Sequence, residues 1–229
     1  MNSFWENQSK KKYGFIHSSS NLSNDKNFSK EKSNNEMKRI KDLLFSSDRK
    51  YNSCIEIGAG SCQWTYMLSK LCKKVLATDT CKSMLDMGQD YTMKKKPINK
   101  IDFFYGDICN IKYPLNSPYD LVFISGLILY LSKNQFSKLI KFISMNTKSS
   151  STLILREPVG INKEFVLDNV YSKELKTNYS AFYRTEKTII DSFKLNNFFV
   201  ETNDWLHPEN SKFNKWKETR LKLISLRRK

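Results

Sequence analysis

One short stretch, residues 53–64, constrains the fold of this chain more than any other. It reads SCIEIGAGSCQW. The apolar run of Cys54, Ile55 and Ile57 predicts a buried strand, two closely spaced glycines follow, and a helical pattern begins near Cys62. This order is typical of an α/β sheet whose turn offers free backbone N–H groups to a ligand. Glycine is needed there because a Cβ would block both the tight turn and the close approach of a ligand.

The turn does not match the dinucleotide-binding fingerprint. That pattern requires a third glycine three residues after the second, where this chain has Gln63. The spacing of Glu56, Gly58 and Gly60 instead resembles the first motif of the class I S-adenosylmethionine-dependent methyltransferases, in which glycines alternate after an acidic residue. Cys62 replaces the third glycine of that motif. On this stretch alone, a turn with a purely structural role stays open.

A second part of the resemblance follows the next predicted strand, residues 74–78. Asp79 comes about 20 residues after Gly58, where nucleoside-binding sheets place a carboxylate that accepts both ribose hydroxyls. The run DTCKSML, residues 79–85, resembles the family's acidic-x-Ser-x-x-Met-Leu element, with Cys81 in place of Ser. The resemblance implies that Met84 flanks the adenine, and a core position for Met84 is the alternative.

Two further elements of the family follow at the expected places. Gly106-Asp107-Ile108, after the predicted strand 101–105, resembles the element whose Asp takes the adenine amino group and whose apolar residue covers the ring. The alternative for Asp107 is a turn residue that caps the next segment. The run YDLVFISGLILYL, residues 119–131, resembles the fourth motif, which implies that Ser125 and Gly126 touch the methionine end through their backbone.

The N-terminus adds one more residue to the implied site. Residues 1–13 predict a short amphipathic helix, and their aromatic-Trp-Glu opening and later Lys-Lys-Tyr resemble the leader helix of many small-molecule methyltransferases. This places Tyr13 over the cofactor; an aromatic that only packs is the alternative. The resemblance thus implies S-adenosyl-L-methionine as the cofactor, bound by Tyr13, Glu56, Gly58, Ala59, Gly60, Asp79, Thr80, Met84, Gly106, Asp107, Ile108, Ser125 and Gly126.

The acceptor pocket is expected around residues 160–185, after a predicted fifth strand at 151–155. This segment is rich in aromatic residues, and aromatic walls with a few polar groups suit a small organic ligand. In the family, inserts at this point commonly build the substrate pocket. The expected substrate-binding residues are Tyr130, Arg156, Tyr179 and Arg184.

An alcohol acceptor would need a general base within hydrogen-bond reach of its hydroxyl. The candidates are His207, Glu157 and Tyr183. His207 precedes Pro208 and is equally compatible with a surface loop, and Glu157 with an ion pair to Arg156 that fixes the loop. No metal site is expected, because the chain has five cysteines, two histidines and no Cys-x-x-Cys pair.

Composition limits the remaining possibilities. The 229 residues, 39% of them hydrophobic, fit one globular domain, divided here into an N-terminal helix and flexible lid (1–30) and a single methyltransferase domain (31–229). No apolar run is long enough to cross a bilayer and no secretory signal is evident, so a cytoplasmic location and no membrane association are expected. The net charge of +16 is concentrated near both ends, which keeps a nucleic-acid partner open.

The sequence therefore predicts an α/β three-layer sandwich, because strands and helices alternate and the chain ends in a hairpin-like pair. The resemblance implies a seven-stranded, mostly parallel sheet with an antiparallel last strand. The expected function is methyl transfer to an oxygen or nitrogen of a small molecule, with a sugar or secondary metabolite as plausible acceptor. The alternatives are an RNA or protein methyltransferase guided by the basic tail, and a non-catalytic cofactor-binding subunit.

Overall fold

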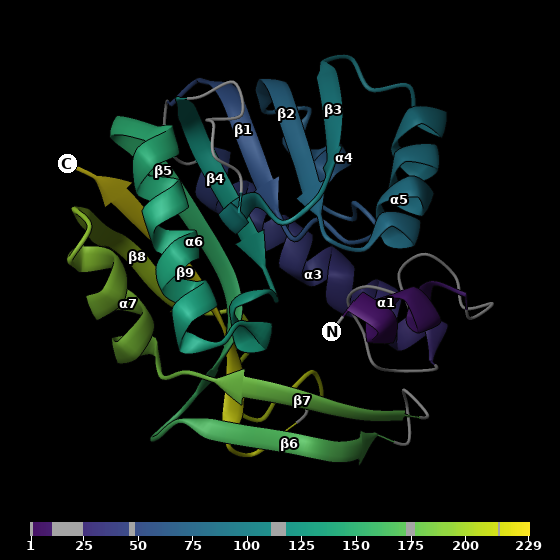
Figure 1. Ribbon diagram of the computed structural model, residues 1–229, viewed down its shortest axis with the longest axis vertical. Helices are drawn as coiled ribbons and strands as arrows, with labels where there is room; N and C mark the ends of the chain where they lie inside the picture. Colours follow the sequence, from purple (N-terminus) through teal and green to yellow (C-terminus); the bar gives the residue numbers. More distant parts are fainter. Residues whose placement is uncertain (1, 11–24, 46–48, 111–117, 173–176, 215) are drawn as a thin grey trace.

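The computed structural model describes residues 2–10, 25–45, 49–110, 118–172, 177–214 and 216–229. At its centre is a seven-stranded sheet in the order β3-β2-β1-β4-β5-β9-β8 (Figure 1). The strands are β1 (Tyr51–Ile57), β2 (Cys72–Asp79), β3 (Lys100–Tyr105), β4 (Tyr119–Ser125), β5 (Thr147–Gly160), β8 (Phe198–Trp205) and β9 (Thr219–Arg228). Strands β1 to β5 pair in parallel, whereas β9 is antiparallel to both β5 and β8.

Helices cover both faces of this sheet and make three layers. The helices are α1 (Asn2–Ser9), α3 (Lys26–Phe45), α4 (Thr65–Leu68), α5 (Lys82–Lys94), α6 (Lys133–Asn146) and α7 (Glu186–Lys194), with 3-10 turns η1 (Ile108–Asn110) and η2 (Ile128–Tyr130). Core contacts place α3, α4 and α5 on one face and α6 and α7 on the other. The predicted three-layer fold is confirmed.

The burial of the central strands explains why their sequences are apolar almost without a break. Side chains along a strand alternate between faces, so Ile55 and Ile57 pack against the α6 and α7 side while Cys54 packs against α3 and α4. Parallel strands covered on both faces therefore read as continuous hydrophobic runs. Phe123 in β4 is completely buried, which contributes about 1.5–3 kcal/mol relative to an exposed side chain.

Two helices begin at the caps that their sequences favour. Thr185 accepts a hydrogen bond from the Thr188 backbone N–H at 3.1 Å, and α7 starts at the next residue. At the start of α6, Ser132 and Gln135 form a reciprocal capping box. Each such cap satisfies backbone N–H groups that the helix itself leaves unpaired.

Two elements differ in extent from the prediction. The helix expected to begin near Cys62 is the four-residue α4, which starts only at Thr65. Gly60 and Cys62 both have positive φ, so neither can join a right-handed helix. The strand expected at 151–155 extends as β5 to Gly160, because its second half pairs with β9. Consequently Arg156 and Glu157 lie within a strand, not in a loop after it.

The aromatic segment expected near residues 160–185 is an antiparallel hairpin of β6 (Phe165–Ser172) and β7 (Thr177–Tyr183). The hairpin lies beyond the carboxyl ends of β1 and β4, and α1 lies toward the same end of the strands (Figure 1). These additions surround the sheet edge where α/β proteins bind ligands. The division into a lid at 1–30 and a domain at 31–229 stays a prediction. Among the described residues, no helix combines the length and apolar character needed to span a membrane.

Candidate active site

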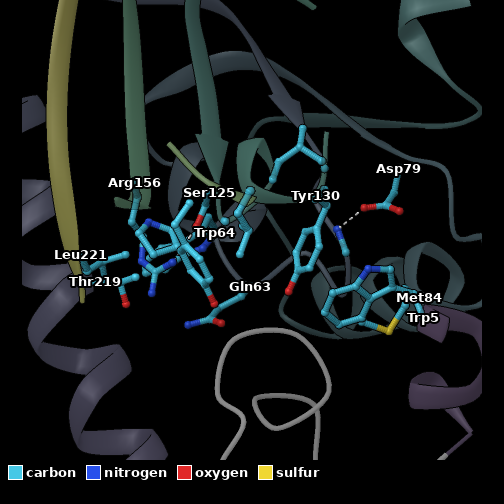
Figure 2. A pocket seen from close by; sticks show the side chains of 18 of the residues that line it. Trp5, Gln63, Trp64, Asp79, Met84, Ser125, Tyr130, Arg156, Thr219 and Leu221 are labelled. Atoms are coloured by element: carbon cyan, nitrogen blue, oxygen red, sulfur yellow. Dashed lines mark hydrogen bonds between the residues drawn. The ribbon is translucent and has the colours of Figure 1, made fainter. Parts of the chain in front are cut away.

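A cavity of about 250 Å³ opens at the carboxyl ends of β1, β2 and β4 (Figure 2). Its volume lies just below the usual range for small-molecule pockets, about 300–1,000 Å³. The cavity brings together many of the residues predicted from sequence: Gly58, Ala59, Gly60, Asp79, Thr80, Met84, Ser125, Gly126, Tyr130, Arg156 and Tyr183.

The glycine turn forms one wall of this cavity. The backbone N–H groups of Gly58 and Ala59 both donate to the Thr78 carbonyl at 2.9 Å, which binds the turn to β2. Gly58 has a φ of +74°, and a Cβ there would lie 3.1 Å from the Leu127 side chain. Another residue at position 58 would therefore be strained in its backbone and crowded by Leu127.

Asp79 joins the glycine turn to the start of α5. Its Oδ2 accepts from the Gly60 N–H at 2.7 Å and its Oδ1 from the Cys81 N–H at 2.8 Å. A carboxylate has about four lone-pair sites, so these bonds leave acceptor capacity for a ligand hydroxyl. Burial raises the pKa of Asp79, while the backbone N–H groups favour its ionised form.

Glu56 lies behind the glycine turn and does not line the cavity. Its Oε2 accepts from the Thr65 hydroxyl at 2.5 Å, and its Oε1 has no hydrogen-bond partner among the described residues. Burial, together with the nearby charge of Asp79, raises the pKa of Glu56 to about 8. Glu56 is therefore mostly protonated at neutral pH, and its visible role is to hold α4 against β1.

The Gly106-Asp107-Ile108 element also lies outside the cavity lining. Asp107 is exposed and accepts from the Asn110 side chain at 2.7 Å, across η1, as the capping alternative predicts. Ile108 is buried in the main core, and the Gly106 N–H donates to the Asp79 carbonyl at 2.9 Å. The adenine contacts expected from this element stay a prediction. Met84 is both buried and part of the cavity wall, so its two alternatives are compatible.

A buried ionic cluster fixes one side of the cavity. Glu36 of α3 accepts from Arg156 through Oε2, at 3.0 Å from Nε and 2.6 Å from Nη2, and its Oε1 lies 2.9 Å from His207 Nε2. Burial opposes the charge of Glu36, but Arg156 and His207 outweigh it and hold its pKa at about 2. Arg156 also donates to the Ser125 hydroxyl at 3.1 Å.

This cluster changes the interpretation of two candidate bases. His207 is buried against Glu36 and does not line the cavity, although the sequence is equally compatible with a surface loop. Glu157 is fully buried, and its Oε1 accepts from the Leu127 and Ile128 N–H groups at 2.8 and 3.2 Å. Burial raises the pKa of Glu157 to about 7. The alternative for these two residues, an ion pair between Arg156 and Glu157, differs from the structure, in which Arg156 pairs with Glu36.

Aromatic residues form the opposite part of the lining. Trp5 of α1 and Tyr130 of η2 pack edge to face with ring centroids 5.5 Å apart (Figure 2). Tyr183 lines the cavity from β7, and burial raises its pKa, so its hydroxyl stays protonated at neutral pH. Tyr179 packs behind it, outside the lining. Arg184 also lies outside, and it donates to the Ile128 and Leu131 carbonyls and thereby braces η2.

Several lining residues were missed by the sequence analysis: Trp5, Lys32, Gln63, Trp64 and Arg220. Trp5 was identified only as part of an amphipathic helix, and Tyr13, chosen from the same segment, lies outside the described residues. Gln63 had a usable signal, since it directly follows the glycine motif. Lys32 and Arg220 had none, because only the packing of α3 and β9 brings them to this edge.

Comparison with known proteins agrees with this geometry. The family model of a methyltransferase domain matches residues 54–149, somewhat less than half of the chain. A SAM-dependent methyltransferase from Methanosarcina mazei is 15% identical over 81% of this chain and 96% of its own, with a TM-score of 0.66. No curated protein matches the sequence.

Two further solved structures carry the demethylated cofactor, S-adenosylhomocysteine. The N-methyltransferase NodS from Bradyrhizobium japonicum WM9 is 14% identical over 99% of this chain and 97% of its own, with a TM-score of 0.67. Phosphoethanolamine N-methyltransferase 1 from Haemonchus contortus, solved with phosphoethanolamine as well, is 20% identical over 98% of this chain and 48% of its own, with a TM-score of 0.66.

The described residues fit the same cofactor. Gly58, Gly60 and Gly126 have positive φ values of 74°, 52° and 64°, so that bare backbone faces the cavity at two strand ends. Asp79 supplies acceptors at the third strand end. The methyltransferase-domain match over residues 54–149 supports the family resemblance, and the lining of the cavity is compatible with S-adenosylmethionine as the cofactor.

Proposed function

We propose that this protein, a class I S-adenosylmethionine-dependent methyltransferase by its domain match and fold, transfers the methyl group to an oxygen or nitrogen of a small molecule. The observation that carries the proposal is the cavity itself. It adjoins the glycine turn and continues between the aromatic residues Trp5, Tyr130 and Tyr183. Aromatic walls with few polar groups suit a small organic acceptor better than a nucleic-acid strand.

The chemistry makes modest demands on the protein. The bound cofactor supplies a methyl group that its positively charged sulfur already activates. The residues of this chain then have to orient the acceptor and exclude water. Gly58, Gly60 and Gly126 are proposed to approach the methionine part through backbone, and Asp79 to accept the ribose hydroxyls. Trp5 and Tyr130 cover the cavity from the α1 side.

Among the three candidate bases, we retain Tyr183 as the residue nearest to an acceptor. It lines the cavity, whereas Glu157 and His207 are buried behind its wall. Because burial raises its pKa, Tyr183 is proposed to act as a neutral hydroxyl that positions the acceptor. An amine acceptor that arrives uncharged needs no stronger base. The NodS and Haemonchus contortus enzymes, described as N-methyltransferases, support nitrogen as one of the two proposed target atoms.

The basic C-terminal segment gives little support to the alternative, a nucleic-acid guide. Much of this segment is strand β9, which lies inside the sheet between β5 and β8. Arg228 donates to the carbonyls of Ser144 and Thr147 at the end of α6, and Arg227 to the Thr152 hydroxyl at 3.2 Å. These charged side chains therefore stabilise the fold through hydrogen bonds. The cytoplasmic location expected from the sequence stays a prediction.

The test is an assay of methyl transfer with methyl-labelled S-adenosylmethionine and panels of small amines, alcohols and phenols. The proposal predicts labelled product with at least one small-molecule class and only a mild response to salt. Label transferred to RNA or protein, with a steep loss between 50 and 200 mM salt, would favour the alternative. Cofactor binding without transfer to any panel would favour a non-catalytic subunit.

A further inference from the structure

Arg220, at the start of β9, is a cation without a close counter-charge. Its side chain is 12% exposed, and the nearest carboxylate oxygen, on the 84% exposed Glu209, is 4.0 Å away. Nη2 donates to the His207 carbonyl at 3.1 Å, but the buried Nε has no hydrogen-bond partner among the described residues. The guanidinium also lies over the Trp205 ring at 4.3 Å. A buried charge left in this state is costly unless something pairs with it.

Gln63 is a second buried polar group in the same cavity without a partner. Its side chain lies in the cavity wall although the residue is only 7% exposed. Neither the amide oxygen nor the amide nitrogen has a hydrogen-bond partner among the described residues. Buried side-chain amides in proteins are nearly always hydrogen-bonded, so an orphaned one indicates a missing ligand or water.

The charges that line the cavity are distributed unevenly. Figure 2 shows Asp79 on one side with Met84 and Trp5, and Arg156, Thr219 and Leu221 on the other. Arg220 comes from the latter side, between Thr219 and Leu221. Among the described lining residues Asp79 is the one carboxylate, while Lys32, Arg156 and Arg220 are cationic. Glu36 pairs with Arg156 and lies 3.9 Å from Lys32 Nζ, so the surplus positive charge on this side is that of Arg220, whose carboxylate neighbour Glu209 is exposed and 4.0 Å away.

From these observations we propose that this side of the cavity binds an anionic group of the methyl acceptor, a carboxylate or a phosphate. Arg220 provides the counter-charge through its guanidinium, Gln63 in the same cavity wall contributes its side-chain amide, and Lys32 adds positive potential. The inference rests on the proposed function, since it concerns the second substrate of that same site. It narrows the acceptor to a small, acidic molecule whose body packs against Tyr183 and Trp216 in the cavity wall.

The test uses three probes of similar shape: benzoate, phenyl phosphate and benzyl alcohol. Each is titrated calorimetrically into the full chain saturated with S-adenosylhomocysteine, so that the carboxylate of the cofactor product already occupies its own place. We expect benzoate or phenyl phosphate to bind at least tenfold more tightly than benzyl alcohol, and the better of the two anions identifies the group. Arg220→Gln should weaken the binding of that anion about tenfold, equivalent to about 1.4 kcal/mol.

Two controls keep the outcomes separate. Lys187→Gln removes an exposed charge on α7, outside the cavity, and should leave anion binding unchanged. Gln63→Leu is a second variant of the site, and its affinity for the anion tests the inference if Arg220→Gln does not fold. Equal binding of all three probes, or anion binding that both site variants leave intact, overturns the inference while the methyltransferase function stands. Failure of the wild-type chain to bind S-adenosylhomocysteine defeats the proposed function and the inference together.

Discussion

Asp79 illustrates how one side chain serves both the fold and the site. Its two oxygens accept hydrogen bonds from the N–H groups of Gly60 and Cys81, so the same carboxylate orders the glycine turn and the start of α5. Asp79 is also part of the cavity lining. A residue of this kind is visible in sequence, because the end of a strand and a fixed distance from the turn identify it.

Removing this carboxylate gives the first prediction. Asp79→Ala should weaken S-adenosylhomocysteine binding by about 10- to 100-fold, because hydrogen bonds to a charged group are worth about 1.5–3 kcal/mol. Calorimetric titration measures the effect, and circular dichroism checks the fold. Asp86→Ala, which removes an exposed carboxylate paired with Lys82 on α5, is the matched control. A folded Asp79→Ala protein with wild-type affinity would exclude the ribose role.

Other residues of the site were predictable only in part. Gly58, Gly60 and Gly126 follow from motif spacing, since their conformation is a local property. The partner of Arg156 does not, because Glu36 lies 120 positions earlier in the chain and only the docking of α3 brings the two together. His207 is a similar case. Nothing in its sequence neighbourhood indicates the carboxylate that binds it.

At the scale of elements, α3 is anchored to the sheet by the contacts of Glu36. One carboxylate binds the middle of this helix to β5 through Arg156 and to the loop between β8 and β9 through His207. The same helix contributes Ile40 and Leu44 to the core. The side of the cavity that carries Lys32, Arg156 and Arg220 therefore depends on a helix that precedes the first strand.

The second prediction tests this anchor. Glu36→Gln should destabilise the protein by about 3–5 kcal/mol, because it leaves the Arg156 cation buried without its partner. For a chain of this size each kcal/mol corresponds to about 2–4 °C, so the melting temperature should fall by roughly 6–20 °C.

Glu31→Gln on the same helix is the control for Glu36→Gln. Glu31 pairs with Lys212, and both side chains are at least half exposed, so its replacement should change the stability by less than about 1 kcal/mol. Scanning calorimetry compares the two variants. Equal and small losses would show that α3 is held by apolar packing alone.

Element types were more predictable than element partners. Apolar runs identified the central strands, and the caps at Ser132 and Thr185 mark where helices begin. The length of β5 was not predictable, because its second half exists only through pairing with β9. The short α4 reflects positive φ at Cys62, a conformation that a cysteine in the sequence does not indicate.

At the scale of the whole molecule, two buried carboxyl groups impose opposite pH dependences on stability. Glu36 has a pKa of about 2, below its ordinary value of 4.5, so its contribution is present above that value and is lost as the pH falls through 2. Glu56 has a pKa of about 8, so between 4.5 and 8 the folded chain holds a proton that the unfolded chain has lost. Stability therefore declines across that window as the pH rises.

The third prediction tests the contribution of Glu56 to the loss of stability as the pH rises. Glu56→Gln should make the decline in the free energy of unfolding between pH 6 and 8 shallower, because a neutral amide keeps an acceptor for Thr65 and has no proton to lose; Glu157, with a pKa of about 7, keeps its own share of the decline. Urea denaturation at four pH values measures both slopes. S-adenosylhomocysteine affinity at pH 7 should change less than threefold, since Glu56 lies outside the cavity lining. Parallel slopes for variant and wild type would contradict the assigned proton.

The most direct test of the whole account is a crystal structure of the chain with S-adenosylhomocysteine. We expect the ribose hydroxyls against Asp79, the adenine beside Met84, and the amino-acid end against the backbone of Gly58 and Gly126. The sulfur should point toward Tyr183 and the cationic side of the cavity. Ligand bound at another edge of the sheet, or a cavity that stays filled by side chains at saturating ligand, would contradict the account.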